Sequence, residues 1–126
     1  MSLNRILTII GETFAAPLSG SYIVRTNHGD VVLREGGFYE GIDLAGADLA
    51  GAKLAKIHLK GANLKGANLV GTVFVDADLT DADLSGANVS GARFNGAVLR
   101  NLKSDHVRIE VPPSGVPPDF FKKCPA

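Results

Sequence analysis

Residues 42–101 read IDLAG ADLAG AKLAK IHLKG ANLKG ANLVG TVFVD ADLTD ADLSG ANVSG ARFNG AVLRN, which is twelve five-residue units without an insertion. The first position is mostly Ala, the third is always Leu, Phe or Val, and the fifth is usually Gly. In an α-helix, residues five apart are offset by roughly 140°, so the third positions would form no single stripe. In a continuous strand they would alternate between faces. The pattern therefore predicts a chain that turns once per unit, with its apolar third positions facing a shared axis.

The tandem A-(D/N)-L-x-G pattern of these units resembles the pentapeptide-repeat proteins. The resemblance implies an all-β fold, a right-handed quadrilateral parallel β-helix in which four units make one square coil. It also implies that the first and third positions fill the interior, while the second, fourth and fifth positions face water. Twelve units then make three coils, and residues twenty apart lie above one another.

This register of twenty predicts the contents of the interior and of the corners. Phe74 should stack between Leu54 and Phe94, and a second column should contain Leu59, Leu79 and Leu99. Glycine at the fifth position suits a type II turn, whose second central residue needs a positive φ. Where glycine is replaced, Asp and Asn tolerate that region better than most residues, at Asp76, Asp81 and Asn101. The unit that ends at Lys56 is expected to turn differently.

Three regions are predicted along the chain: an N-terminal cap over residues 1–36, the β-helix over 37–111 and a proline-rich C-terminal tail over 112–126. The cap should contain a β-hairpin, because two β-prone runs within 21–35 flank the loop residues 27–30. Residues 1–20 fit either a helix or a strand. Pro112 and Pro113 are expected to end strand pairing.

Both ends of a solenoid expose apolar interior and unpaired edges, and therefore need a cap. At the C-terminal end the candidate cap or dimer contacts are Ile109, Val111, Phe120 and Phe121. If the chain associates with itself, we expect two coils to abut at that end as a twofold homodimer.

Composition excludes a strong electrostatic bias of the whole chain. Thirteen basic residues balance thirteen acidic ones, so neither direct nucleic-acid binding nor membrane binding is expected. The one cysteine, Cys124, cannot form an internal disulfide, which favours a cytoplasmic protein.

No motif for catalysis, cofactor binding or metal binding occurs in the sequence. The three histidines are widely separated, the single cysteine has no metal-binding partner nearby, and the glycines belong to the repeat units. We therefore expect no catalytic residue and no cofactor.

Charged and apolar side chains at outward positions define a candidate interaction surface. Lysines 53, 56, 60 and 65 form a basic belt, and an acidic belt follows one coil later. The register places Asp76 beside Lys56 and Asp78 beside His58, which favours cross-strand pairing. The alternative is that the acidic belt, together with outward-facing valines, forms a docking surface. That candidate surface comprises Val70, Val73, Val75, Asp76, Asp78, Asp81 and Asp83.

These observations favour a non-enzymatic structural or protein-binding module whose partner is not identified by the sequence. The family resemblance implies one alternative, because some pentapeptide-repeat proteins mimic duplex DNA and bind type II topoisomerases such as DNA gyrase. Such mimicry calls for a long acidic rod, whereas this chain is neutral and its coil is only about 15–20 Å tall. An enzyme is the third alternative, and no site motif supports it.

Overall fold

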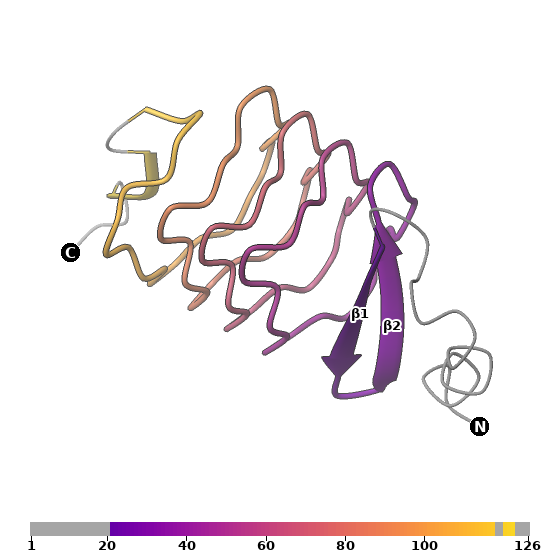
Figure 1. Cartoon of the computed structure of the whole chain (residues 1–126). Coiled ribbons are helices and arrows are strands. Elements are labelled where there is room, and N and C mark those ends of the chain that lie inside the picture. Colours follow the sequence, from indigo (N-terminus) through magenta and orange to yellow (C-terminus); the bar gives the residue numbers. More distant parts are fainter. Residues whose placement is uncertain (1–20, 118–119, 123–126) are drawn as a thin grey trace.

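The computed structural model describes residues 21–117 and 120–122, and the expectations for residues 1–20 and for Cys124 lie outside this range. The described chain begins with strands β1 (Ser21–Thr26) and β2 (Gly29–Arg34) and ends with a 3-10 turn, η1 (Phe120–Lys122). Between them the chain winds into stacked square coils, with the β1–β2 hairpin at one end and the C-terminal segment at the other (Figure 1). This is the predicted right-handed quadrilateral β-helix.

Parallel bridges between residues twenty apart hold the coils in register. Asp43 pairs with Asn63, which pairs in turn with Asp83, and the same spacing begins as early as Phe38 and His58. Third-position and fifth-position N–H groups donate to carbonyls of the next coil; for example, the Leu44 N–H lies 2.7 Å from the Asn63 oxygen. The predicted register is confirmed, with residues 37–41 as an atypical first unit.

Each unit closes with a type II turn. The Ala47 N–H donates to the Leu44 oxygen at 3.0 Å, and Gly46 between them has a φ of 70°. The same left-handed backbone recurs where glycine is replaced, at Asp76, Asp81 and Asn101. The expectation that the unit ending at Lys56 turns differently is wrong, because Lys56 has a φ of 62° and keeps the same turn.

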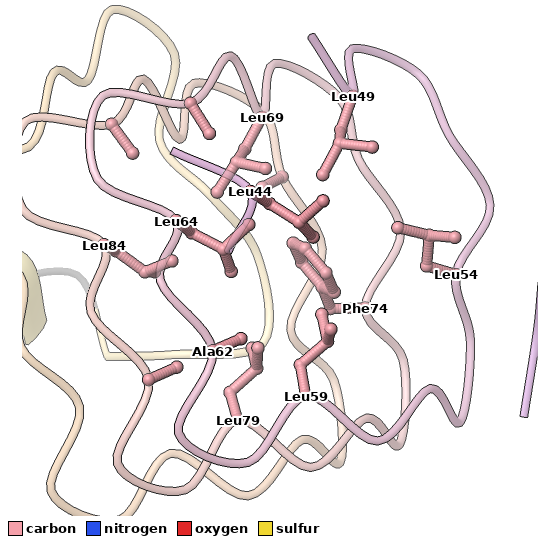
Figure 2. Close-up of a cluster of buried hydrophobic side chains, with 14 of the residues drawn as sticks. Leu44, Leu49, Leu54, Leu59, Ala62, Leu64, Leu69, Phe74, Leu79 and Leu84 are labelled. Atoms are coloured by element: carbon pink, nitrogen blue, oxygen red, sulfur yellow. The ribbon is translucent and has the colours of Figure 1, made fainter. Parts of the chain in front are cut away.

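The interior is filled by the third positions and by the small first positions. Figure 2 shows the leucines at positions 44, 49, 54 and 59 of one coil pointing inward, and all four are buried. The rings of Phe74 and Phe94 are stacked, with centroids 5.7 Å apart and 13° between the ring planes. Together with the register that stacks Leu54 beneath Phe74, this confirms the predicted aromatic column.

The four walls of the coil are named here after the interior residue that each contributes to the first full coil. At the second position of each unit, the Leu44 face presents Asp43, Asn63, Asp83 and Lys103, and the Leu49 face presents Asp48, Asn68, Asn88 and Arg108. The Leu54 face presents Lys53, Val73, Arg93 and Ser114, and the Leu59 face presents Phe38, His58, Asp78 and Val98.

The β1–β2 hairpin closes the N-terminal end. Its strands pair antiparallel from Ser21 with Arg34 to Thr26 with Gly29, as expected for residues 21–35. One side of the hairpin joins the core through Val24 and Leu33, which are buried. Its tip is tied to the first coil by His28, whose Nε2 lies 2.7 Å from a carboxylate oxygen of Asp43.

The last coil is shifted by one residue. Arg93 pairs with Ser114, twenty-one residues on, whereas Asn88 still pairs with Arg108 at the usual twenty. Strand pairing therefore continues beyond Pro112 and Pro113, and the expectation that it ends there is wrong. The prolines are tolerated because neither is itself a paired residue of the ladder, so their missing N–H groups remove no coil-to-coil bond.

The shift has two consequences for packing. The Glu110 N–H now donates to the Ser90 hydroxyl at 2.7 Å, so that Ser90 is buried although it occupies an outward position. Phe121 lies on the Phe94 ring, with centroids 5.7 Å apart, and Phe120 meets Phe121 edge-on at 4.8 Å. The aromatic column of the interior therefore ends on a side chain from η1.

Candidate interaction surface

The second position of the unit has a structural role that the repeat pattern alone did not reveal. The Asp43 carboxylate accepts the Ala45 N–H at 3.1 Å, and this side chain-to-backbone bond recurs at Asp48, Asn63, Asn68, Asp78, Asp83 and Asn88. The fourth-position N–H is the one that bonds to no backbone carbonyl. The restriction of the second position to Asp and Asn in many units was the available signal, since these residues bond to backbone two residues on.

The structure spreads the seven residues of the predicted interaction surface around the middle coil. Val73 and Val75 lie on the Leu54 face, and Asp76 follows at the next corner. The others continue around the axis, with Val70 on the Leu49 face, Asp78 on the Leu59 face, Asp81 at a corner and Asp83 on the Leu44 face. They form a belt across four walls and share no single wall. Partner binding by this belt stays a prediction.

Two carboxylates of the belt are already engaged within the chain. Asp78 accepts the Thr80 hydroxyl at 2.6 Å and the Thr80 N–H at 3.0 Å, and these bonds lower the pKa of Asp78. Burial raises the pKa of Asp83, but bonds from Ser85 and the charge of Lys65 outweigh it and lower that pKa. Lys65 Nζ lies 3.7 Å from the Asp83 carboxylate. Both groups are therefore ionised at neutral pH and have partners.

The two predicted charge pairs between coils do not form direct contacts. Asp78 is the ladder neighbour of His58, as the register requires, but the His58 ring stacks on Phe38, with centroids 4.3 Å apart. Asp76 and Lys56 form no ion pair among the described residues. Direct pairing at these two places was a wrong expectation, because the Asp78 carboxylate is turned to Thr80 and the His58 ring to an aromatic neighbour.

The four candidate cap or dimer residues differ in burial. Phe121 is buried, Phe120 and Ile109 are partly buried against the core, and Val111 is 58% exposed. Their proposed part in a homodimer stays a prediction.

Within residues 21–117 and 120–122, no three His, Cys, Asp or Glu side chains gather where they could hold a metal ion. His28 lies at the hairpin tip, His58 on the Leu59 face and His106 at a corner of the last coil. The same residues include no helix that is long and apolar enough to span a bilayer.

The fold and the repeat geometry define a class of protein, and comparison with known families gives the same answer. A profile described as pentapeptide repeats, in eight copies, matches residues 42–81 and 62–101. Through residues 42–101, this chain belongs to the pentapeptide-repeat family.

Solved structures with the same repeat are similar to this chain. A pentapeptide repeat protein from the thylakoid lumen of Arabidopsis thaliana is 38% identical with a TM-score of 0.59, over 60% of this chain and 52% of that protein. One from Nostoc is 28% identical with a TM-score of 0.53, over 61% of this chain and 81% of that protein. This chain thus spans about half of the Arabidopsis protein. No curated protein sequence matches it.

A more distant likeness is to QnrB1, a plasmid-mediated fluoroquinolone resistance protein, at 25% identity over 59% of this chain and 44% of that protein. The TM-score is 0.42, which is too low to carry a functional argument.

Proposed function

We propose that this chain is a non-catalytic module that binds a protein partner through one wall of its coil. The supporting observation is the ladder of outward side chains, such as Asp48, Asn68, Asn88 and Arg108, each paired with its equivalent one coil away. The backbone between them is held by coil-to-coil bonds of about the same length throughout. Such a wall is ordered before binding, so that association costs little conformational entropy.

The proposal is tested by cross-linked capture from extracts of the source cells, one wall at a time. Four variants each reverse one exposed cation: Lys103→Glu on the Leu44 face, Arg108→Glu on the Leu49 face, Lys53→Glu on the Leu54 face and Lys60→Glu on the Leu59 face. All four change the net charge equally. We expect one variant to lose a partner that the other three retain. Identical capture by all four, or no captured protein, would contradict a wall-specific binding module.

The DNA-mimicking binder of a type II topoisomerase is the alternative implied by the family, and the charges do not favour it. A duplex mimic needs carboxylates repeated along one wall. The Leu49 ladder has Asp48 alone among its second positions, and on the Leu44 face Asp43 and Asp83 are paired with His28 and Lys65. We expect no inhibition of DNA gyrase in a supercoiling assay. Inhibition that Asp76→Asn together with Asp81→Asn relieves would replace our proposal with this alternative.

We infer a cytoplasmic location as part of the same proposal. It is supported by the single cysteine, Cys124, since no disulfide within the chain is available to stabilise the fold. Cell fractionation tests the location. Recovery of the protein from a membrane-enclosed lumen would contradict it.

A further inference from the structure

We propose that the Leu54 face is the binding wall and that its ligand is an extended acidic segment of a partner protein. This inference rests on the proposed function and names the wall and the chemistry of the partner. It departs from the acidic belt that the sequence suggested, because the belt crosses four walls and part of it is already paired. Two features of the Leu54 face support it, its charge and its apolar centre, and the face also offers free backbone donors.

The Leu54 face carries three cations, and no carboxylate of the described chain pairs with them. Lys53, Lys56 and Arg93 are exposed, and none lies within ion-pair distance of an acidic side chain among the described residues. Two carboxylates lie at outward positions of this face: Asp76, at the corner where it lies against Gly96, and the exposed Glu35, which precedes the Gly36 that bonds to Ala55. This wall therefore has an excess of positive charge although the whole chain is neutral.

Several cations on the other three walls have acidic neighbours. On the Leu44 face, Lys65 pairs with Asp83, and on the Leu49 face Arg108 Nη2 lies 3.8 Å from the Glu110 carboxylate. On the Leu59 face the charge of Lys60 acts on Asp78 and contributes to its lowered pKa. Arg100 on the Leu59 face also has no ion-pair partner among the described residues, but that wall carries Asp78, so the Leu54 face has the larger excess of cations.

The backbone of the Leu54 face adds outward hydrogen-bond donors, a feature that it shares with the Leu59 face, where Lys60 and Arg100 also follow second positions without Asp or Asn. Lys53 and Val73 occupy second positions where Asp or Asn would accept the fourth-position N–H. The N–H groups of Ala55 and Val75 consequently find no acceptor within the described chain. Because the backbone repeats from unit to unit, these groups point outward, as the Ala45 N–H does toward Asp43. A carbonyl or carboxylate of a ligand could accept both.

Valines occupy the centre of this wall. Val73 lies in the ladder between Lys53 and Arg93, and Val75 lies beside it on the same unit. Both are half-buried, so each keeps some apolar surface accessible to a partner. A segment that combines acidic residues with an apolar residue would match this arrangement of charge around an apolar centre.

The spacing of the cations fits an extended chain that runs along the coil axis. Lys53 and Arg93 are two coils apart, which is roughly 10 Å at the usual spacing between strands. An extended chain advances about 3.3 Å per residue, so carboxylates about two to four residues apart reach both cations. Phosphates of a nucleic acid would also meet the cations, but they would leave the two valines without apolar contact. The protein segment is therefore the ligand that we infer.

The test uses a fluorescein-labelled peptide built from Glu, Ser and Val, and a second peptide in which Gln replaces every Glu. Binding to the full chain is measured by fluorescence anisotropy at low and high salt. We expect the acidic peptide to bind, the Gln peptide to bind at least about tenfold more weakly, and salt to weaken the difference. The Lys53→Glu/Arg93→Glu variant should lose binding of the acidic peptide by about tenfold or more.

The matched control is Lys60→Glu/Arg100→Glu on the Leu59 face, which makes the same change in net charge at exposed positions. It should bind the acidic peptide as the unchanged protein does. Circular dichroism confirms that both variants keep the fold. Equal losses in the two variants, equal affinity for the Gln peptide, or a preference for a short DNA duplex would each overturn the inference.

This test and the capture experiment fail in distinguishable ways. If the captured partner is lost from Lys103→Glu, Arg108→Glu or Lys60→Glu instead of Lys53→Glu, the binding module stands and the assignment to the Leu54 face is overturned. If no wall selects a partner, the proposed function itself fails.

Discussion

The two ends of the coil stack are closed by different means. At the N-terminal end, the β1–β2 hairpin places Val24 and Leu33 on the core and pairs its own backbone in an antiparallel ladder. At the C-terminal end, Phe121 covers one interior column, while Leu102, Val107 and Ile109 remain only partly buried. One end is a sheet with paired backbone, and the other depends on side-chain packing.

The difference indicates that stability decreases along the axis toward the C-terminus. The N-terminal closure is bonded to the coil through backbone, since the Gly36 N–H donates to the Ala55 oxygen, and through the His28–Asp43 pair. The C-terminal closure has fewer buried groups per residue, and segments of this kind open locally before the whole fold unfolds. Substitutions in the interior, at each end and at the surface can test this gradient.

The interior provides the largest effect. Phe94→Ala removes a ring that is packed between Phe74 and Phe121, and we expect it to lower the free energy of unfolding by about 3–5 kcal/mol. Urea denaturation measures this loss. Val98→Ala is the control, because Val98 is 44% exposed and its loss should change stability by less than about 0.5 kcal/mol. A denaturation midpoint that Phe94→Ala leaves in place would refute the stacked column.

The N-terminal closure should be nearly as sensitive. Leu33→Ala removes a fully buried side chain of β2, and we expect a loss of about 2–4 kcal/mol in the same assay. Ile23→Ala on β1 is the matched control, because Ile23 is 44% exposed on the opposite side of the hairpin. Equal effects of the two substitutions would mean that the hairpin does not close the core.

Substitutions in the C-terminal closure should lower the free energy of unfolding by less. Phe121→Ala should lower stability by about 1–2 kcal/mol, below the usual cost for a buried phenylalanine, because this end can open locally. Removal of residues 117–126 should expose the end and raise the mass measured by light scattering, through the predicted homodimer. An unchanged mass and an unchanged melting temperature would retire both the capping and the dimer roles of this segment.

The smallest effect concerns the salt link at the hairpin tip. The Ala45 N–H, and then His28, lower the pKa of Asp43 from its usual 3.8. A carboxyl with a lowered folded pKa stabilises the fold above its unfolded pKa, and that stabilisation is lost as the pH falls through the folded pKa. Asp43→Asn should therefore weaken the loss of stability below about pH 4. Melting curves across acidic pH measure it, and identical curves for the two proteins would count against the link.

His28→Gln separates the two causes in the same assay. It removes the ion pair but keeps the Ala45 bond, which is the larger cause of the lowered pKa. Most of the acid sensitivity should therefore remain in His28→Gln.

Much of the architecture follows from the period of five, because few backbone conformations can bury an apolar side chain at the third position of every unit. The interior columns, the hairpin over residues 21–35 and the atypical unit at 37–41 were all predictable. The shift in the last coil was not, since the Glu110 N–H bond to the Ser90 hydroxyl that accompanies it joins residues twenty apart. The prediction for Lys56 was wrong because the surrounding coil imposes a positive φ at this corner, and this outweighs the preference of a lysine for a negative φ.

The candidate surface was harder to predict from the sequence, because residues of one square coil that are more than a few positions apart lie on different walls. The acidic belt looked continuous from Val70 to Asp83, but the structure distributes it around the axis. The Leu54 face became visible only once the walls were assigned, since its distinction is that Lys53 and Arg93, which have no ion-pair partner among the described residues, flank Val73 in one ladder.

The register of twenty also links the number of units to two quantities, the length of the coil along its axis and the rotation of the chain about that axis. Each added set of four units would move Phe121 away from the hairpin by about 4.8 Å and leave the walls aligned. A single added unit would instead turn everything after it by a quarter of a revolution. The number of five-residue units thus determines both the distance between the two closures and the orientation of the C-terminal closure about the coil axis.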